Sequence, residues 1–120
     1  IRAARPGQVK DDLQKISRQV MAGELIRLGM IRKEEEIDHY YLHGSGHFIG
    51  LYTHDVGESP KNRLEENMVF TLEPGLYFPQ EKIGIRIEDT LLVTRDGCEV
   101  LTQAIPKTVE EIEALMEERE

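Results

Sequence analysis

The chain has 120 residues, of which 39% are hydrophobic and 32% are charged, with a formal net charge of -8. This length suits one domain with a hydrophobic core and is too short for two ordinary domains. The acidic balance argues against a nucleic-acid partner, and because no apolar run approaches the ~20 residues of a membrane span, no membrane partner is expected.

A helix is predicted over residues 9–28. It follows a Pro6-Gly7 turn, and Gly29 lies where a C-terminal cap belongs. Asp11 falls in the first turn, where the helix dipole favours negative charge. The apolar residues at helical spacing are Val9, Leu13, Ile16 and Val20. The next segment, residues 31–42, predicts a short helical turn followed by extended chain at Tyr40–Leu42.

Three of the four histidines lie in the glycine-rich stretch "HGSGHFIGLYTHDVG", residues 43–57. The spacing of His43 and His47 would suit one face of a helix, but Gly44 and Gly46 disfavour a helix by ~1 kcal/mol each. A strand, a glycine-rich turn and a returning extended segment fit the stretch better. His39 lies outside this stretch and is expected to be a surface or structural histidine.

Two strands are predicted, within residues 67–78 and 82–93, because both segments are rich in β-branched and aromatic residues. Side chains alternate across a strand, so in the first segment Phe70 and Leu72 share one face while Thr71 and Glu73 share the other. Glu73 stands at the end of its strand, immediately before Pro74-Gly75, which stops the ladder.

The second strand, "GIRIEDT", has an apolar and a charged face. Ile83, Ile85 and Ile87 form the apolar face, which is expected to pack on the core, and Arg86 and Glu88 lie on the opposite face. Taken alone, this charged face would be an exposed, weak ion pair. Two carboxylates at strand positions, together with three clustered histidines, favour a metal or acid–base site, and these donors suit Mn, Co, Zn or Fe.

The chain ends with a predicted hairpin around Asp96-Gly97 and a helix that begins at Thr108. Glu111 completes a capping box with Thr108. The order helix, strands, helix indicates an α+β domain over residues 1–120. The hairpin contains the only cysteine, Cys98, so an internal disulfide is excluded and a reducing cytoplasmic location is expected.

The motifs "HGSGHFIGLYTHDVG", "TLEPGLY" and "GIRIEDT", in this order, resemble the pita-bread metallopeptidases, in particular their proline-specific branch. That branch contains the Xaa-Pro aminopeptidases and the Xaa-Pro dipeptidases (prolidases). The resemblance extends over nearly the whole chain and implies the C-terminal half of a pita-bread fold, an antiparallel sheet with flanking helices. It also implies hydrolysis of the peptide bond before proline by a metal-activated water, with proline-containing peptides as substrates.

The resemblance implies a two-metal centre. His47 matches the histidine that binds one metal, Glu73 the glutamate that binds the same metal, and Glu88 the glutamate that bridges both metals. Manganese is the expected metal, and cobalt, zinc and iron are alternatives. Four residues match catalytic positions: His43 and His54 would contact substrate and stabilise charge at the scissile peptide, Glu73 would help activate the water, and Arg86 would lie behind the ligands.

Members of this family complete the centre with two aspartates from a hairpin before the helix that opens this chain. No residue here matches them, so the chain would carry three of five ligands. Together with the first residue, Ile1, this predicts the C-terminal portion of a catalytic domain whose N-terminal part is absent. We therefore expect an inactive chain that binds at most one ion weakly, and a homo-oligomer, with exchanged elements as one route to it.

Three other readings remain open. The Xaa-Pro dipeptidases share these motifs with the aminopeptidases. Creatinase-like hydrolases share the fold without a metal, but this reading leaves His47, Glu73 and Glu88 unused. Some pita-bread domains are non-enzymatic binding modules, but those tend to lose ligand residues that this chain retains.

Overall fold

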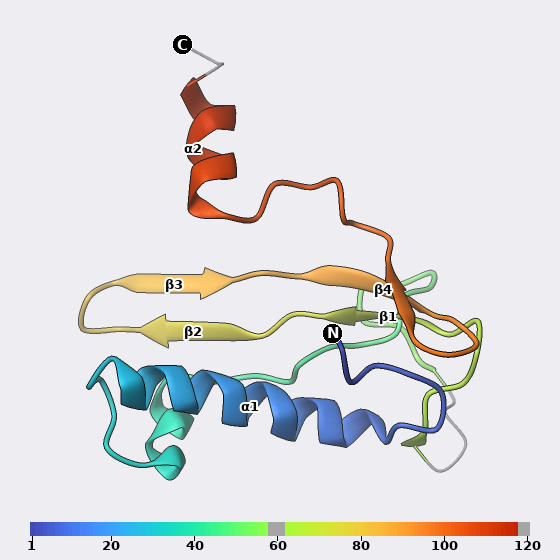
Figure 1. The fold of residues 1–120 in the computed structure, drawn as a ribbon, viewed down its shortest axis with the longest axis horizontal. Coiled ribbons are helices and arrows are strands. Elements are labelled where there is room, and N and C mark those ends of the chain that lie inside the picture. Colours follow the sequence, from blue (N-terminus) through green and yellow to red (C-terminus); the bar gives the residue numbers. More distant parts are fainter. Residues whose placement is uncertain (58–61, 118–120) are drawn as a thin grey trace.

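The structure is a computed structural model that describes residues 1–57 and 62–117. Its elements combine helices with short antiparallel strands, as expected for an α+β domain (Figure 1). No helix within these two ranges is long and apolar enough to cross a bilayer. In chain order the elements are α1 (Lys10–Arg27), 3-10 helix η1 (Glu34–His39), β1 (Val69–Leu72), β2 (Gly75–Phe78), β3 (Ile83–Arg86), β4 (Asp89–Val93), β5 (Cys98–Val100) and α2 (Val109–Glu117).

Helix α1 confirms the predicted helix to within one residue at each end. Its C-terminus is closed by Gly29, whose φ of 72° is easily reached only without a side chain. The Gly29 N–H donates to the Ile26 carbonyl and the Met30 N–H to the Leu25 carbonyl, both at 2.9 Å. This pair of bonds is a Schellman motif, so the cap predicted at Gly29 is present.

The strands form three antiparallel pairs, β1 with β4, β2 with β3 and β4 with β5, and the first two of these pairs share one register. Strand β1 pairs with β4, with Leu72 opposite Asp89, and β2 pairs with β3, with Gly75 opposite Arg86. Figure 1 shows β2 continuing the line of β1, and β3 the line of β4. Pairing is interrupted only at residues 73–74 and 87–88, where Pro74 has no N–H to donate. Extending the register across this gap places Glu73 opposite Glu88.

The core forms two clusters between the helices and one face of the strands. One cluster lies between the start of α1 and the three-stranded sheet β1-β4-β5, and its buried members are Ala4, Leu13, Leu64, Phe70, Leu72, Leu91 and Val93. The other lies between the end of α1, η1 and β2, and its buried members are Ala22, Leu25, Ile31, Ile37 and Tyr41. Phe70 and Leu72 share one face as predicted, and this face is the one that packs on the core, while Glu73 points to the other side.

The expectation that the isoleucine face of "GIRIEDT", which comprises the end of β3 and the residues after it, packs on the core is wrong for this chain. Ile83, Ile85 and Ile87 are 51%, 59% and 45% exposed. Their face is the one that Leu76 and Phe78 present to the helices, because paired residues in a sheet point to the same side. Helix α1 runs along the β2 side of the ribbon and leaves β3 uncovered (Figure 1).

Two further expectations about local structure need correction. Tyr40–Leu42 do not form a strand, because Tyr40 closes the last turn of η1 with an N–H that donates to the Ile37 carbonyl. The segment after His47 is not a regular extended strand either, since only isolated bridges from Phe48 to Asp55 and Phe70 are formed. The predicted hairpin is confirmed, with β4 and β5 joined through residues 94–97.

Helix α2 stands away from the rest of the described chain, and its described side chains are exposed (Figure 1). Its N-terminus has the predicted capping box. The Thr108 N–H donates to Glu111 Oε2 at 3.0 Å, and the Glu111 N–H donates to Thr108 Oγ1 at 3.2 Å. The Lys107 N–H also donates to Glu111 Oε2, at 2.9 Å. This helix is therefore held mainly by its own cap.

The cap predicts that the helicity of α2 depends on pH. Hydrogen bonds from the backbone N–H groups of Lys107 and Thr108 lower the pKa of Glu111 below its ordinary value of 4.5. A lowered pKa means that the cap stabilises α2 above pH 4.5 and is lost as the pH falls through the lowered value. We expect the ¹³Cα shifts of residues 109–117 to report this loss on acidification. Glu111→Ala should show reduced helicity at neutral pH, whereas Glu113→Ala should titrate like the wild type.

Candidate metal centre

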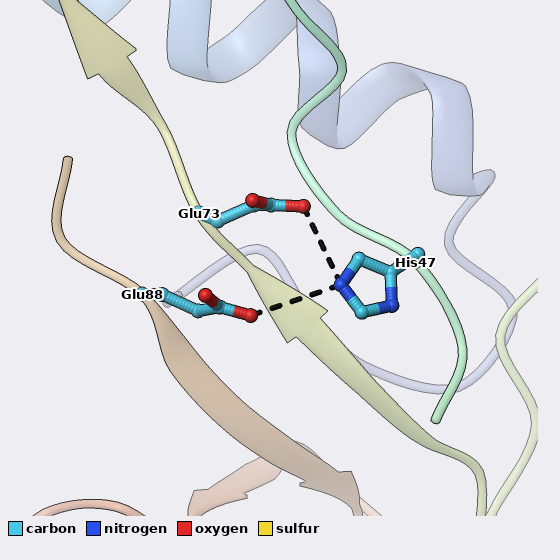
Figure 2. Close-up of side chains that lie close together, drawn as sticks. All are labelled: His47, Glu73 and Glu88. Carbon is cyan, nitrogen blue, oxygen red and sulfur yellow. Dashed lines mark ion pairs between the residues drawn. The ribbon is translucent and has the colours of Figure 1, made fainter. Parts of the chain in front are cut away.

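Three side chains that the sequence singled out as metal ligands converge on one face of the sheet (Figure 2). His47 Nε2 lies 3.6 Å from Glu73 Oε1 and 3.8 Å from Glu88 Oε1. One potential ligand atom from each residue lies within 4.8 Å of the other two. The predicted grouping of His47, Glu73 and Glu88 is therefore present in the structure.

The strand register explains why the two carboxylates meet. Glu73 and Glu88 are cross-strand neighbours at the interruption between the two strand pairs, and directly opposed side chains have Cβ atoms about 4.5–5.5 Å apart. Like charges placed directly opposite destabilise a sheet. A cation between them would offset this cost.

The glycine-rich segment reaches the site because it runs beside β1 as an additional, irregular strand. The Thr71 N–H donates to the His47 carbonyl at 2.8 Å, and the Glu73 N–H donates to the Ser45 carbonyl at 2.7 Å. The His47 N–H donates to Thr71 Oγ1 at 3.0 Å. A Cβ on Gly46 would lie 1.8 Å from the Thr71 carbonyl oxygen, so only glycine permits this approach.

The orientation of His47 favours metal binding. Its Nδ1 lies 2.9 Å from the Phe48 carbonyl oxygen. A carbonyl can only accept, so Nδ1 carries the proton, and in the neutral ring Nε2 keeps its lone pair for the space beside the carboxylates. Such a backbone contact is typical of metal-binding histidines. The side chains of His47 and Glu73 are only 17% and 12% exposed, and that of Glu88 is 43% exposed, so the site opens to solvent on the Glu88 side.

A hydrogen-bonded chain of three further side chains lies beside the ligands. Arg86 Nη1 is 3.6 Å from Glu73 Oε2, and Arg86 Nε donates to the Tyr77 hydroxyl at 2.9 Å. That hydroxyl lies 2.8 Å from His43 Nε2. The other nitrogen of this ring, Nδ1, is 2.7 Å from the Gly44 carbonyl, which accepts its proton, so the Tyr77 hydroxyl donates to Nε2. The hydrogen bond to Tyr77 raises the pKa of Arg86, which stays charged.

Tyr77 is a residue of this site that the sequence analysis missed. It stands opposite Gly84 and diagonally across the strand pair from Arg86, on the face that also carries Glu73. The strand register would have predicted this contact. Gly75 stands opposite Arg86, so Tyr77, two residues further along β2 on the same face, is the diagonal neighbour of the Arg86 guanidinium. The alternation of each strand taken alone does not reveal this contact.

The two remaining histidines lie in different surroundings. The His54 ring lies edge-on to the His47 ring, with centroids 4.5 Å apart, and is exposed. Hydrogen bonds from the backbone N–H groups of Val56 and Tyr52 lower the pKa of the neighbouring Asp55. The Asp55 carboxylate therefore stabilises the loop in which it lies. His39 is exposed at the end of η1 and takes no part in this grouping.

The chain matches known proteins over nearly its full length. The family model described as "Metallopeptidase family M24" matches residues 1–95. The Xaa-Pro aminopeptidase of Haemophilus influenzae is 36% identical over 91% of this chain, and that of Escherichia coli is 36% identical over 97%. The chain spans only 29% and 30% of the lengths of these two relatives.

Solved structures agree with this match. A putative aminopeptidase P from Bacillus anthracis superposes with a TM-score of 0.92 at 48% identity, covering 98% of this chain and 28% of that chain. The aminopeptidase PepP of Pseudomonas aeruginosa gives 0.86 at 38% identity, covering 97% of this chain and 31% of that chain. The chain thus has part of the pita-bread fold, and its similarity is to the Xaa-Pro aminopeptidase branch. With its sequence motifs, its fold and its cluster of potential metal ligands in agreement, the chain belongs to metallopeptidase family M24.

Proposed function

We propose that the chain is part of an Xaa-Pro aminopeptidase that hydrolyses the peptide bond before proline and contains two divalent metal ions. The single observation that carries this proposal is the convergence of His47, Glu73 and Glu88, with ligand atoms within 4.8 Å of one another. The names of the relatives support the aminopeptidase over the dipeptidase. The retention of all three expected ligand residues within this chain argues against a non-enzymatic module.

The donor set fits a divalent first-row cation. One neutral imidazole nitrogen and two carboxylates suit manganese, cobalt, zinc or iron, and the opposed carboxylates supply the negative charge that such an ion balances. When bound, divalent cations lower the pKa of a water and polarise a carbonyl. We propose manganese as the metal; a zinc-substituted Escherichia coli aminopeptidase P, 35% identical to this chain, suggests that such sites accept more than one ion.

Four residues receive catalytic roles in this proposal. His43 and His54 would contact the peptide and stabilise charge at the scissile carbonyl. An imidazole N–H can donate to developing negative charge, which His43 would do only after its Nδ1–H leaves the Gly44 carbonyl or its Nε2 gains a proton. Glu73 would accept a proton from the attacking water. Arg86 would hold Glu73 in place from behind, consistent with its 3.6 Å contact to Glu73 Oε2.

Calorimetric titration with Mn²⁺ and Zn²⁺ tests the proposal. Only three ligands gather in the described part of the chain, so we expect weak binding of at most one ion, lost in His47→Ala. The intact peptidase would need further ligands from outside this chain. Two tightly bound ions per chain, or cleavage of a Xaa-Pro peptide that a chelator abolishes, would contradict the expected inactivity of the chain alone.

We also propose that the chain self-associates. Apolar side chains on β3 and on α2, such as Ile85 and Ile112, are exposed to solvent, and their burial against another chain would be favourable. Light scattering at tens of micromolar should therefore give a mass above the monomer's 13.8 kDa. Ile85→Lys should lower this mass, whereas Ile105→Lys, in the linker before α2, should not. A monomeric wild-type chain would contradict the proposal.

We also propose a cytoplasmic location, because the one cysteine of this sequence, Cys98, cannot form an internal disulfide. Cys98 is a free thiol, and partial burial raises its pKa, which makes the thiolate scarce. A thiol of this kind is compatible with a reducing compartment.

A further inference from the structure

Gln14, on the second turn of α1, joins this helix to the glycine-rich segment. Its carboxamide forms two hydrogen bonds of opposite polarity to the backbone on either side of Gly44. Gln14 Nε2 donates to the His43 carbonyl at 3.2 Å, and Gln14 Oε1 accepts from the Ser45 N–H at 2.5 Å. One side chain therefore holds two backbone groups about thirty positions further along the chain.

These two bonds secure the edge of the segment that faces away from β1. On its β1 edge, the segment is held by the Glu73 N–H, which donates to the Ser45 carbonyl at 2.7 Å. Within the described part of the chain, Gln14 is the one partner of the His43 carbonyl and of the Ser45 N–H. Ser45 is only 6% exposed, so its N–H would be a buried donor without an acceptor if Gln14 were removed.

The chemistry of the contact selects glutamine. The side chain must offer a donor and an acceptor from one planar group at this length. Glutamate offers only the acceptor that Ser45 needs, and methionine, of similar length, offers neither a donor nor a strong acceptor. An oxygen of Gln14 would also lie 3.9 Å from a Cβ at Gly44, so the carboxamide closes over the segment without crowding it.

We infer that Gln14 is a positioning residue for the metal centre. By fixing the backbone between His43 and Ser45 against α1, it sets the course of the segment from which the His47 ring faces Glu73 and Glu88. The same two hydrogen bonds position His43, whose Nε2 accepts a hydrogen bond from the Tyr77 hydroxyl. This role deepens the proposed function and rests on it.

Two measurements on the metal-free 120-residue chain test the effect of the two Gln14 hydrogen bonds directly. The variants are Gln14→Met and Gln14→Glu, and the control is Gln19→Met on the exposed side of the same helix. In Gln14→Met, exchange of the Ser45 amide should speed up roughly tenfold more than exchange of the core amide of Leu91. The nuclear Overhauser effect between the His47 and His54 rings, which are 4.5 Å apart, should weaken.

The other variants sharpen the result. Gln14→Glu keeps the acceptor and should protect the Ser45 amide better than Gln14→Met does, while Gln19→Met should match the wild type in both measurements. Metal titration adds a third comparison, in which Gln14→Met should bind about tenfold more weakly than the control.

Unchanged Ser45 exchange or unchanged ring contact in Gln14→Met would overturn the inference. So would an unchanged metal affinity, if the wild type binds metal. A wild type that binds no metal would instead refute the proposed function, and the two metal-free measurements would still decide whether Gln14 positions the His47 ring.

Discussion

Glu88→Gln is expected to abolish metal binding by the chain without destabilising the metal-free fold. The substitution keeps the shape of the side chain and removes one of the two carboxylate charges in the proposed ligand set. Metal affinity should fall by more than the roughly 10–100-fold that the loss of an outer partner of a ligand costs, because Glu88 is itself a ligand in the proposed site. Calorimetric titration with Zn²⁺ measures this loss.

The stability of the metal-free variant should move in the other direction. Glu88 stands opposite Glu73, and opposed like charges cost a sheet about 0.2–1 kcal/mol. The 3.8 Å contact of Glu88 with His47 offsets little of this, since Glu88 is 43% exposed to solvent. We therefore expect the free energy of unfolding in urea to rise by about 0.5 kcal/mol. Ligand side chains that destabilise the empty fold, and that stabilise it once an ion is bound, are typical of a metal-binding site.

Glu99→Gln provides the matched control. Glu99 is an exposed strand residue that stands opposite Leu92 in the β4–β5 pair, so the same change of charge occurs away from the centre. It should leave both metal affinity and metal-free stability close to those of the wild type. If Glu88→Gln retained the affinity of this control, Glu88 would not be a ligand and the proposed centre would be wrong.

The sequence contains enough to predict that Glu73 and Glu88 meet. Strand alternation puts each carboxylate on the face opposite its apolar neighbours, and Pro74 marks the place where pairing stops. Once the segment that contains β1 and β2 is paired with the segment that contains β3 and β4 without a shift in register, the two glutamates must stand opposite each other. The glycines around Ser45 predict a close backbone approach, and the structure places that approach against β1.

Other features depend on contacts that no local pattern contains. The alternation of Ile83, Ile85 and Ile87 defines a face but not what covers it, and α1 covers only the β2 side of that ribbon. Tyr77 becomes visible only when the two strands are set side by side. Gln14 reads as an ordinary helix residue, because its partners lie far along the chain and are backbone atoms.

Gly46→Ala should produce the largest loss of stability of the substitutions considered. A Cβ at this position would lie 1.8 Å from the Thr71 carbonyl oxygen and 2.8 Å from its carbon. Both atoms belong to the backbone of β1, which cannot rotate away as a side chain could. The segment from Ser45 to His47 would have to leave β1, and its hydrogen bonds to Thr71 and Glu73 would break. We expect the free energy of unfolding to fall by about 3 kcal/mol, at the upper end of the usual cost of overpacking.

Gly44→Ala separates this steric effect from the general cost of replacing glycine in the segment. The nearest atom to a Cβ there is Gln14 Oε1 at 3.9 Å, an ordinary contact. Gly44→Ala should therefore keep nearly the wild-type midpoint in urea and its Zn²⁺ affinity, whereas Gly46→Ala should lose both, because a segment displaced from β1 moves the His47 ring away from Glu73 and Glu88. Equal midpoints for the two alanine variants would mean that the segment does not pair with β1 in solution, and the placement of His47 in the centre would fail with it.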